Sequence, residues 1–144
     1  MKLIVYTDGG ARGNPGHAAI GVVIKDTSAG SGQVKKYSEY IGDATNNVAE
    51  YKALILGLKK AKQVVGKDLA RKTEIDVRSD SELMIRQLSG RYKLKDENIQ
   101  KLFIEVWNLK TEFKSVSFKH IPREENSVAD GLVNEELDSR KRMF

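Results

Sequence analysis

The first third of the chain alternates apolar and polar positions in the way that β-strands do. Residues 2–8 form one such run, and 17–26 and 33–42 form two more, separated by the turn-rich segment ARGNPG and the Gly- and Ser-rich segment TSAGSG. Because the connections are short, consecutive strands are expected to pair antiparallel. The pattern therefore predicts a three-stranded meander whose first strand ends at Asp8.

Beyond residue 44 the apolar positions recur every three or four residues, which is typical of amphipathic helices. The first such stretch runs from Val48 to Gly66, and Thr45, Asn46 and Asn47 are its candidate capping residues. Further elements are predicted at 73–80 (strand), 81–90 (helix), 97–113 (helix), 115–121 (strand) and 125–137 (helix).

A meander followed by alternating strands and helices implies a mixed sheet with helices packed on its faces. The helices at 97–113 and 125–137 are expected to bury apolar sides that include Trp107 and Val128. Ligands bind near strand ends in such sheets, and Asp80 follows the strand at 73–80. Asp80 is therefore the best anchor for a functional cleft, and Asp8 is expected to end a neighbouring strand.

Length and composition narrow the class of protein. We expect a single domain over residues 1–144, with 138–144 as a candidate flexible tail. The chain has no cysteine, which excludes a disulfide framework, a thiolate zinc site and a cysteine nucleophile. No run approaches the ~20 apolar residues that a membrane span needs. We therefore expect a soluble, cytoplasmic monomer that does not bind membranes.

The net charge of +5 and the pI near 9.3 favour a polyanionic partner, although many ordinary proteins are equally basic. Basic residues gather at 59–62, at 91–95 and at 140–142. Each group could equally be a solvated surface. Charge alone thus favours nucleic acid as a partner without establishing it.

Four acidic residues stand at the ends or starts of predicted elements: Asp8, Glu50, Asp80 and Asp130. Carboxylates that converge in one cleft raise one another's pKa, and a hard divalent cation relieves that repulsion. Mg²⁺, or alternatively Mn²⁺, suits such ligands, and two ions about 4 Å apart can hold the attacking water and the leaving oxygen of phosphodiester hydrolysis. Taken singly, each acid could equally be a turn, capping or surface residue. With two histidines and no cysteine, a zinc site or a serine triad is disfavoured.

The blocks TDGGARGNPG, TNNVAEYKALILGL, SDSELMIRQLSGRYKLK and HIPREENSVADGLVN each contain one of these acids. In this order and spacing they closely resemble type 1 ribonuclease H, and the resemblance covers nearly the whole chain. It implies the ribonuclease H-like α/β fold, a five-stranded mixed sheet of three antiparallel and two parallel strands flanked by helices. It also implies endonucleolytic hydrolysis of the RNA strand of RNA/DNA hybrids, with 5′-phosphate and 3′-hydroxyl ends.

The same resemblance implies the site residues. Asp8, Glu50, Asp80 and Asp130 would be the catalytic, metal-binding set, with two ions when substrate is bound and Asp8 between them. Hybrid selectivity requires that 2′-hydroxyls be recognised across a shallow minor groove. The implied substrate contacts are Gly9, Gly10, Ala11, Asn14, Thr45, Asn46, Asn47, Ser81, Lys95 and Asn126. A turn role for Asn14, and capping roles for Asn46 and Asn47, are the alternatives.

Three departures from the better-known bacterial pattern change these expectations. Only SGRYKLKD separates the SDS block from the helix near Glu97, so the basic protrusion of many bacterial relatives is absent, as in shorter archaeal-like forms. We therefore expect weaker substrate affinity. Before Asp130, we assign a catalytic role to Arg123 rather than to His120, because a guanidinium can stabilise negative charge on phosphate. Glu82 is an additional acid beside the predicted cleft.

Other activities stay open at this point. They are a nuclease that also cuts double-stranded RNA, a phosphatase on the same fold, and a hybrid-binding module without catalysis. A module without catalysis has no physical need for all four acids, whereas the first two alternatives would use them.

Overall fold

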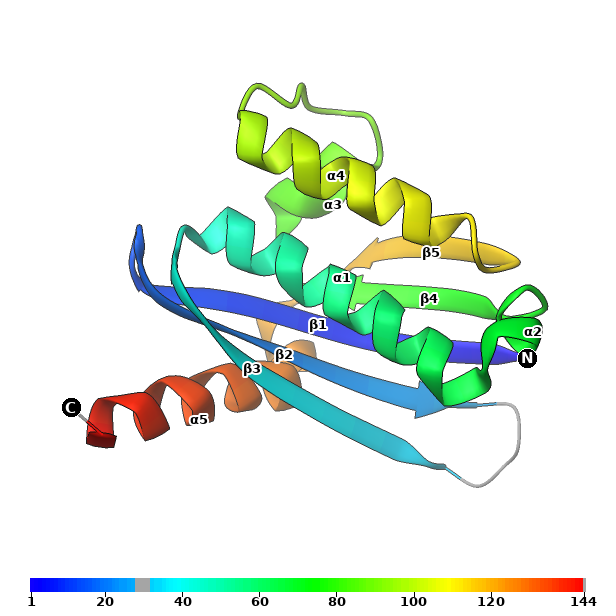
Figure 1. The fold of residues 1–144 in the computed structure, drawn as a ribbon, viewed down its shortest axis with the longest axis horizontal. Coiled ribbons are helices and arrows are strands. Elements are labelled where there is room, and N and C mark those ends of the chain that lie inside the picture. The colour runs from blue at the N-terminus through cyan, green and yellow to red at the C-terminus, as the bar shows by residue number, and fades with distance from the viewer. Residues whose placement is uncertain (28–31, 144) are drawn as a thin grey trace.

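The computed structural model describes residues 1–27 and 32–143, and its strands form one mixed sheet. The strands are β1 (Lys2–Gly13), β2 (Gly16–Asp26), β3 (Val34–Ala44), β4 (Glu74–Ser79) and β5 (Ser115–His120). They lie in the order β3-β2-β1-β4-β5; β1, β2 and β3 pair antiparallel, whereas β4 and β5 run parallel to β1 (Figure 1). The predicted five-stranded mixed sheet is thus confirmed. Most of the predicted TSAGSG break lies outside the described residues.

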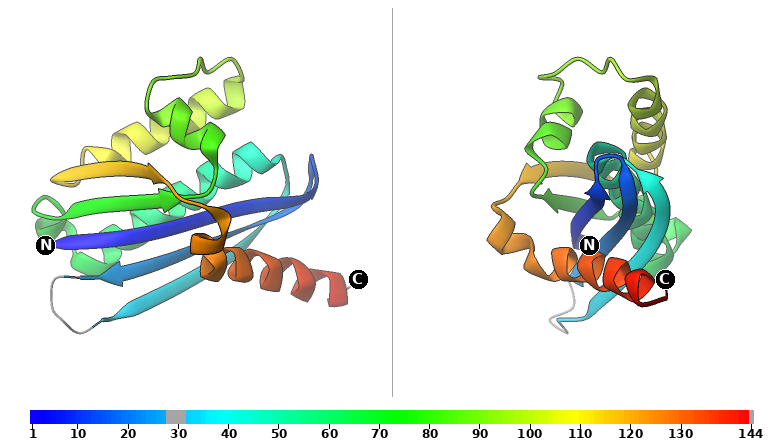
Figure 2. Two further views of the ribbon diagram at one scale, coloured as in Figure 1. Left: turned by 180° about the vertical axis from the view of Figure 1, so that it is seen from behind. Right: turned by 90° about the vertical axis from the view of Figure 1, so that its left-hand side faces the viewer.

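Helices cover both faces of this sheet. They are α1 (Asn46–Val65), α2 (Lys67–Ala70), α3 (Glu82–Leu88), α4 (Glu97–Lys110), the 3-10 turn η1 (Arg123–Asn126) and α5 (Ser127–Met143). Helix α1 packs on β1 and β2 with α4 beside it, and α5 packs on β2, β1 and β3 from the opposite face (Figure 1, Figure 2). In the described ranges, no helix combines the length and the apolar character that crossing a membrane requires.

The main core lies between α1 and the sheet. Tyr51 and Leu54 of α1 are fully buried in one cluster with Val5 of β1. Burial of each large apolar side chain contributes about 1.5–3 kcal/mol. On the opposite face, α5 buries a smaller cluster that includes Val133 and Leu137. The two helices are therefore held unequally, and each carries one of the predicted acids.

Strand β1 continues past Asp8 to Gly13, so the expectation that the strand ends at Asp8 is wrong, whereas the predicted turn lies within ARGNPG, at Asn14 and Pro15. The antiparallel pairing with β2 runs on to the hairpin at Gly13–Gly16 and satisfies the backbone groups of this glycine-rich segment. The parallel neighbour β4 stops earlier, at Ser79 opposite Thr7. Asp8 is thus the first β1 residue beyond the end of β4, which leaves that side of the strand open to a cleft.

Helix α1 begins close to the predicted position, and Thr45 is its cap. The Thr45 hydroxyl oxygen accepts a hydrogen bond from the Val48 N–H. Asn46 and Asn47, the other two candidates, are instead the first helical residues. Gly66 ends the helix with a φ of 87°, a backbone conformation that favours glycine. The predicted helix end is therefore confirmed.

Some local features differ from the predictions. The short helices α2 and η1 were not predicted, because four residues cannot show a helical period. Trp107 and Val128, expected on buried sides, are 54% and 50% exposed, since α4 and α5 each bury only one narrow side. Residues 138–143, the candidate tail, form the last turns of α5, and residue 144 lies outside the described part.

Candidate active site

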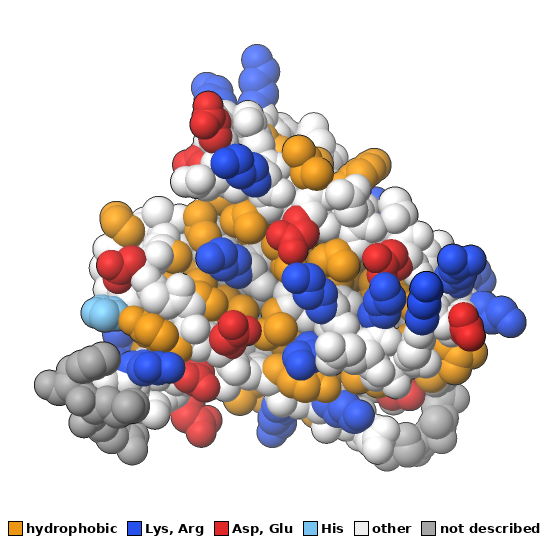
Figure 3. All heavy atoms as spheres, viewed as in Figure 1, with side chains coloured by type: hydrophobic (Ala, Val, Ile, Leu, Met, Phe, Trp, Pro, Cys, Tyr) orange, Lys and Arg blue, Asp and Glu red, His pale blue; other side chains and the backbone are white. Residues whose placement is uncertain are grey.

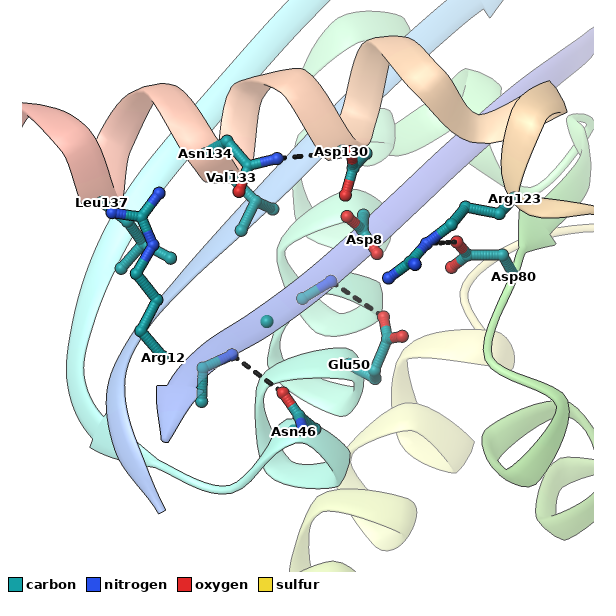
Figure 4. Close-up of a pocket in the computed structure, with 13 residues that line it drawn as sticks. Asp8, Arg12, Asn46, Glu50, Asp80, Arg123, Asp130, Val133, Asn134 and Leu137 are labelled. Carbon is teal, nitrogen blue, oxygen red and sulfur yellow. Dashed lines mark hydrogen bonds and ion pairs between the residues drawn. The ribbon is translucent and has the colours of Figure 1, made fainter. Parts of the chain in front are cut away.

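All four predicted acids line one pocket, although they come from four separate parts of the chain. Asp8 lies on β1, Glu50 on α1, Asp80 directly after β4 and Asp130 on α5 (Figure 4). Carboxylate oxygens of Asp8, Glu50 and Asp80 lie within 4.8 Å of one another. Asp130 points toward Asp8 from α5, and the pocket has a volume of about 470 Å³. The four carboxylates therefore converge on one pocket, as the sequence predicted.

Two glycines allow the flanking helices to approach the sheet closely. A Cβ on Gly9 would lie 2.3 Å from the backbone carbonyl of Ala49 in α1. One on Gly21 would lie 2.6 Å from the backbone oxygen of Ala129 in α5. The approach of α1 also lets the Gly9 N–H donate to Oε1 of Glu50 at 2.8 Å. Each contact lies one residue before an acid of the site. Because Gly9 follows Asp8 on β1 and Gly21 pairs with Asp8 from β2, both helices place their carboxylates near Asp8.

Polar contacts orient the other two acids. Oγ of Ser79 accepts a hydrogen bond from the Ser81 N–H at 3.0 Å, which fixes the backbone turn that carries Asp80. On α5, Oδ2 of Asp130 accepts from Nδ2 of Asn134, one helical turn away, at 3.3 Å. Neighbouring groups of the chain therefore hold these carboxylates in place.

The pocket concentrates negative charge where little water reaches it. Burial, and then the charges of Asp80 and Asp130, raises the pKa of Asp8 to about 8. Burial and the charges of Asp8 and Asp80 also raise the pKa of Glu50 well above its ordinary value, although a backbone hydrogen bond and Arg123 lower it. A divalent cation between these oxygens would relieve the repulsion. The donor set, oxygen atoms only and close together, fits Mg²⁺ or Mn²⁺.

Part of the expected substrate-contacting set lines the same pocket, namely Gly9, Gly10, Ala11 and Asn46. Oδ1 of Asn46 accepts from the Ala11 N–H at 2.9 Å, and the Asn46 N–H donates to Oδ1 of Asn14 at 3.0 Å. These bonds tie the β1–β2 hairpin to the start of α1. Asn14 therefore supports the pocket edge without lining it.

Four other expected contacts lie away from the pocket. Thr45 lines a neighbouring hollow, and Asn47 is half-buried at the start of α1. Ser81 caps α3, where its hydroxyl accepts from the Met84 N–H. Lys95 is exposed on the connection between α3 and α4. A duplex wider than the acidic pocket could still reach these residues, so their roles stay predictions.

Asn126, another expected substrate contact, is buried behind the site. It is only 1% exposed, and its Nδ2 donates to the backbone oxygen of Thr7 at 2.9 Å. This bond joins the η1 turn to β1 next to Asp8. Asn126 therefore acts on the site through the backbone that carries an acid.

Arg123 lies beside the acids, and His120 does not. Nε of Arg123 is 4.0 Å from Oδ2 of Asp80, and the Arg123 side chain is 84% exposed (Figure 4). His120 is the exposed last residue of β5 and is not among the residues that line the pocket. Glu82 also lies outside the lining and pairs with Arg86 on α3.

The basic residues of α1 lie on a different face. Lys59 of α1 pairs with Glu105 of α4, and Lys62 of α1 pairs with Glu112, two residues after the end of α4. Figure 3 shows blue and red side chains interspersed over this face. Such mixing is typical of a solvated surface. Between α3 and α4 the chain forms a short connection without a helix, in agreement with the expected absence of a basic protrusion.

Sequence reasoning missed four residues that line the pocket: Arg12, Val133, Asn134 and Leu137. The first follows from the alternation of a strand, since residues 8, 10 and 12 of β1 share one face. That signal was hidden because the strand was predicted to end at Asp8. The others lie three to seven residues after Asp130 on α5, on the helix side that faces β1.

The fold and the pocket together define a class of protein. A mixed sheet in the order β3-β2-β1-β4-β5, with carboxylates from β1, α1, the end of β4 and α5, is the arrangement of ribonuclease H-like proteins. The model of the reverse transcriptase-like family matches residues 6–136. The chain therefore belongs to this family, and the relatives below place it among the type 1 ribonuclease H proteins.

Two curated relatives illustrate the similarity. Ribonuclease HI of Halobacterium salinarum is 41% identical over 137 residues, which are 95% of this chain and 65% of that protein. A bifunctional protein of Mycobacterium tuberculosis is 39% identical over 139 residues, which are 96% of this chain and 36% of that protein. The chain thus spans only part of the length of these relatives.

Solved structures agree with this placement. LC11-RNase H1, isolated from compost, has a TM-score of 0.86 and 48% identity, and the match covers 96% of this chain and 97% of that one. A structure of LC11-RNase H1 in complex with an RNA/DNA hybrid has a TM-score of 0.87 and 46% identity, with 96% and 98% covered. The resemblance to type 1 ribonuclease H is confirmed.

Proposed function

We propose that this chain hydrolyses the RNA strand of RNA/DNA hybrids endonucleolytically with divalent metal ions, and leaves 5′-phosphate and 3′-hydroxyl ends. The convergence of Asp8, Glu50, Asp80 and Asp130 on one pocket carries the proposal. The similarity to LC11-RNase H1, which has been solved with an RNA/DNA hybrid, supports the choice of substrate. All four acids come from one chain, so a monomer is sufficient.

The carboxylates are the residues that would hold the metal. Asp8, Glu50 and Asp80 form the tight group and Asp130 completes the set, and together they would hold two ions when substrate is bound. Mg²⁺ is the expected ion and Mn²⁺ the alternative. When bound, such ions lower the pKa of a water molecule and neutralise negative charge on phosphate.

The chain's own groups prepare this site. Since Oε1 of Glu50 accepts from the Gly9 N–H, the other carboxylate oxygen stays available to a ligand. Asn134 keeps Asp130 directed into the pocket. Arg123 extends from η1 beside Asp80, and its guanidinium can stabilise the negative charge that develops on the scissile phosphate.

The pocket edge suits a shallow minor groove. Gly9, Gly10 and Ala11 present backbone with little side chain, and Asn46 adds an amide. In duplexes that contain RNA, 2′-hydroxyls and base edges are displayed across a wide, shallow minor groove. Backbone and short polar groups can approach such a surface closely, which supports recognition of a hybrid.

A cleavage assay tests the proposal. Labelled RNA/DNA hybrid, RNA/RNA duplex, DNA/DNA duplex and a small phosphate ester are incubated with the chain, with Mg²⁺ or with a chelator. We expect cleavage of the hybrid alone, only with metal, and products whose 5′ ends can be ligated directly. Equal cleavage of RNA/RNA would indicate the broader nuclease, and hybrid binding without cleavage would indicate a non-catalytic module.

A further inference from the structure

We infer that Arg12 is an additional substrate-binding residue, which contacts a backbone phosphate of the RNA strand beyond the scissile one and pairs with Asp138 when no substrate is bound. The inference rests on the proposed function and extends it to a residue outside the four acids. Arg12 lines the same pocket as the acids, with its side chain 43% exposed.

The alternation of β1 places Arg12 in line with Asp8. A Cβ on Gly9 would meet α1, whereas one on Gly10 would lie 3.5 Å from Cγ1 of Val133 on α5. Asp8, Gly10 and Arg12 therefore share the face of β1 that is turned toward α5. Four residues of strand span about 13 Å. Arg12 is thus too far along β1 to contact the phosphate that lies at the acids. It is placed to contact another phosphate of the RNA strand.

A positive charge at the Arg12 end of the pocket would favour binding of a nucleic-acid strand. The middle of the pocket carries four carboxylates, which repel the phosphates of a bound strand wherever no metal lies between them. Among the described residues that line the pocket, Arg12 and Arg123 are the two cationic ones, and Figure 4 shows them at opposite ends. A guanidinium at each end would hold the strand on both sides of the acids.

Asp138 fixes the Arg12 guanidinium without using all of its donors. Oδ1 of Asp138 lies 2.6 Å from Nη2 of Arg12, and the remaining N–H groups of the guanidinium stay available. Asp138 follows buried Leu137, and two residues later the Arg140 guanidinium lies 4.5 Å from the centre of the Tyr40 ring. The Asp138 side chain is half exposed, so the pair is weak and a phosphate can displace the carboxylate.

Steady-state cleavage of a labelled hybrid at several salt concentrations tests the contact, with Arg12→Gln compared with Arg71→Gln. Arg71 precedes β4 at the Lys2 end of the sheet, so it provides the same charge change far from the pocket. For Arg12→Gln we expect KM to rise about threefold to tenfold, kcat to change less than twofold, and the slope of log KM against log salt to fall by about 1. Arg12→Lys should lie between native and Arg12→Gln, because it keeps the charge and loses the planar fork.

Removing the competing carboxylate should act in the opposite direction. Asp138→Asn should lower KM about twofold to threefold, whereas Asp68→Asn on α2, with the same charge change, should not. In the double variant Arg12→Gln/Asp138→Asn the effect of Asp138→Asn should vanish, because it acts through Arg12. Melting temperatures separate a loss of folding from a loss of binding.

The outcomes distinguish the two proposals. A native chain that cleaves the hybrid, together with Arg12→Gln of unchanged KM and salt slope, overturns the assignment of Arg12 alone. An Arg71→Gln effect as large as that of Arg12→Gln would also overturn it, since the cause would be net charge. A native chain that does not cleave overturns the proposed function and this inference together.

Discussion

Helices α1 and α5 flank the same sheet and each supplies one acid, but different forces hold them. Helix α1 is embedded in the main core, and even its acid, Glu50, is 9% exposed. Helix α5 packs on the opposite face of the sheet, buries Ala129, Val133 and Leu137, and leaves Asp130 partly exposed. Apolar packing therefore fixes the α1 side of the site.

Polar contacts, one buried and two exposed, complete the attachment of α5. The buried bond from Asn126 to the Thr7 backbone lies at its start, a hydrogen bond from the Ser38 hydroxyl to Glu136 lies midway, and the Arg12–Asp138 ion pair lies near its end. Exposed polar contacts contribute little, because water replaces them at low cost. The α1 side of the site is therefore rigid, and the α5 side can adjust.

The largest expected difference is in the loss of activity when the acid of α1, Glu50, or the acid of α5, Asp130, is neutralised. Glu50→Gln should lower kcat by about 10³-fold or more, because it removes a member of the tight carboxylate group and several kcal/mol of charge stabilisation. Asp130→Asn should cost about 10–100-fold, because this residue lies outside that group on the adjustable helix. Single-turnover cleavage at saturating Mg²⁺ measures both. Equal losses would contradict the distinction.

Substitution of Gly9, which contacts α1, should likewise cost more than substitution of Gly21, which contacts α5. Gly9→Ala places a Cβ 2.3 Å from the α1 backbone, which the core holds, so we expect a loss of about 3 kcal/mol or more in the free energy of unfolding. Gly21→Ala meets α5, which can shift outward, and should cost about 1–3 kcal/mol while lowering activity through Asp130. Urea denaturation measures the stabilities.

Gly131→Ala is the matched control for these two variants. It lies on α5, and its Cβ would have no neighbour within 4 Å. The substitution should leave stability unchanged or raise it slightly, because alanine favours a helix. If Gly21→Ala destabilised the chain as much as Gly9→Ala, α5 would be held as firmly as α1.

The buried carboxyl group of Asp8 should also make the stability of the fold depend on pH in the absence of metal. Asp8 has an ordinary pKa of 3.8 and a pKa of about 8 in the fold, because burial and its acidic neighbours disfavour the charge. As pH rises from about 4 to about 8, the unfolded chain loses this proton before the folded one does. The free energy of unfolding should therefore fall by a few kcal/mol across that window and level off above it.

Asp8→Asn should remove most of this slope, and the variant should be more stable than the native chain at pH 8 without metal. Mg²⁺ at pH 8 should raise the melting temperature of the native chain more than that of the variant. Parallel melting curves with chelator and with Mg²⁺ measure both effects. An Asp8→Asn variant that is less stable than the native chain at pH 8 would show that the site is not strained by its charges.

The embedded part of the molecule was also the part that the sequence predicted best. The period of α1 follows from burial, which leaves a regular apolar pattern, and its end follows from the glycine at position 66. The end of β1 left no such pattern: beyond Asp8 the strand is glycine-rich, and its extension depends on pairing with β2 rather than on its own side chains. Arg12 was missed for this reason, and the positions of Trp107 and Val128 were wrong because peripheral helices bury little.

The smallest expected difference concerns one buried hydrogen bond on each side. Asn126→Ala removes the bond to Thr7 and leaves its backbone oxygen unsatisfied, whereas Tyr51→Phe removes the bond from the Tyr51 hydroxyl to Oε1 of Gln87. Each should cost about 1–2 kcal/mol of stability. Asn126→Ala should also lower kcat severalfold, because η1 positions both Arg123 and the start of α5, while Tyr51→Phe should leave kcat within twofold. Since the stability losses match, an equal loss of activity in Tyr51→Phe would mean that activity follows general stability rather than the attachment of α5.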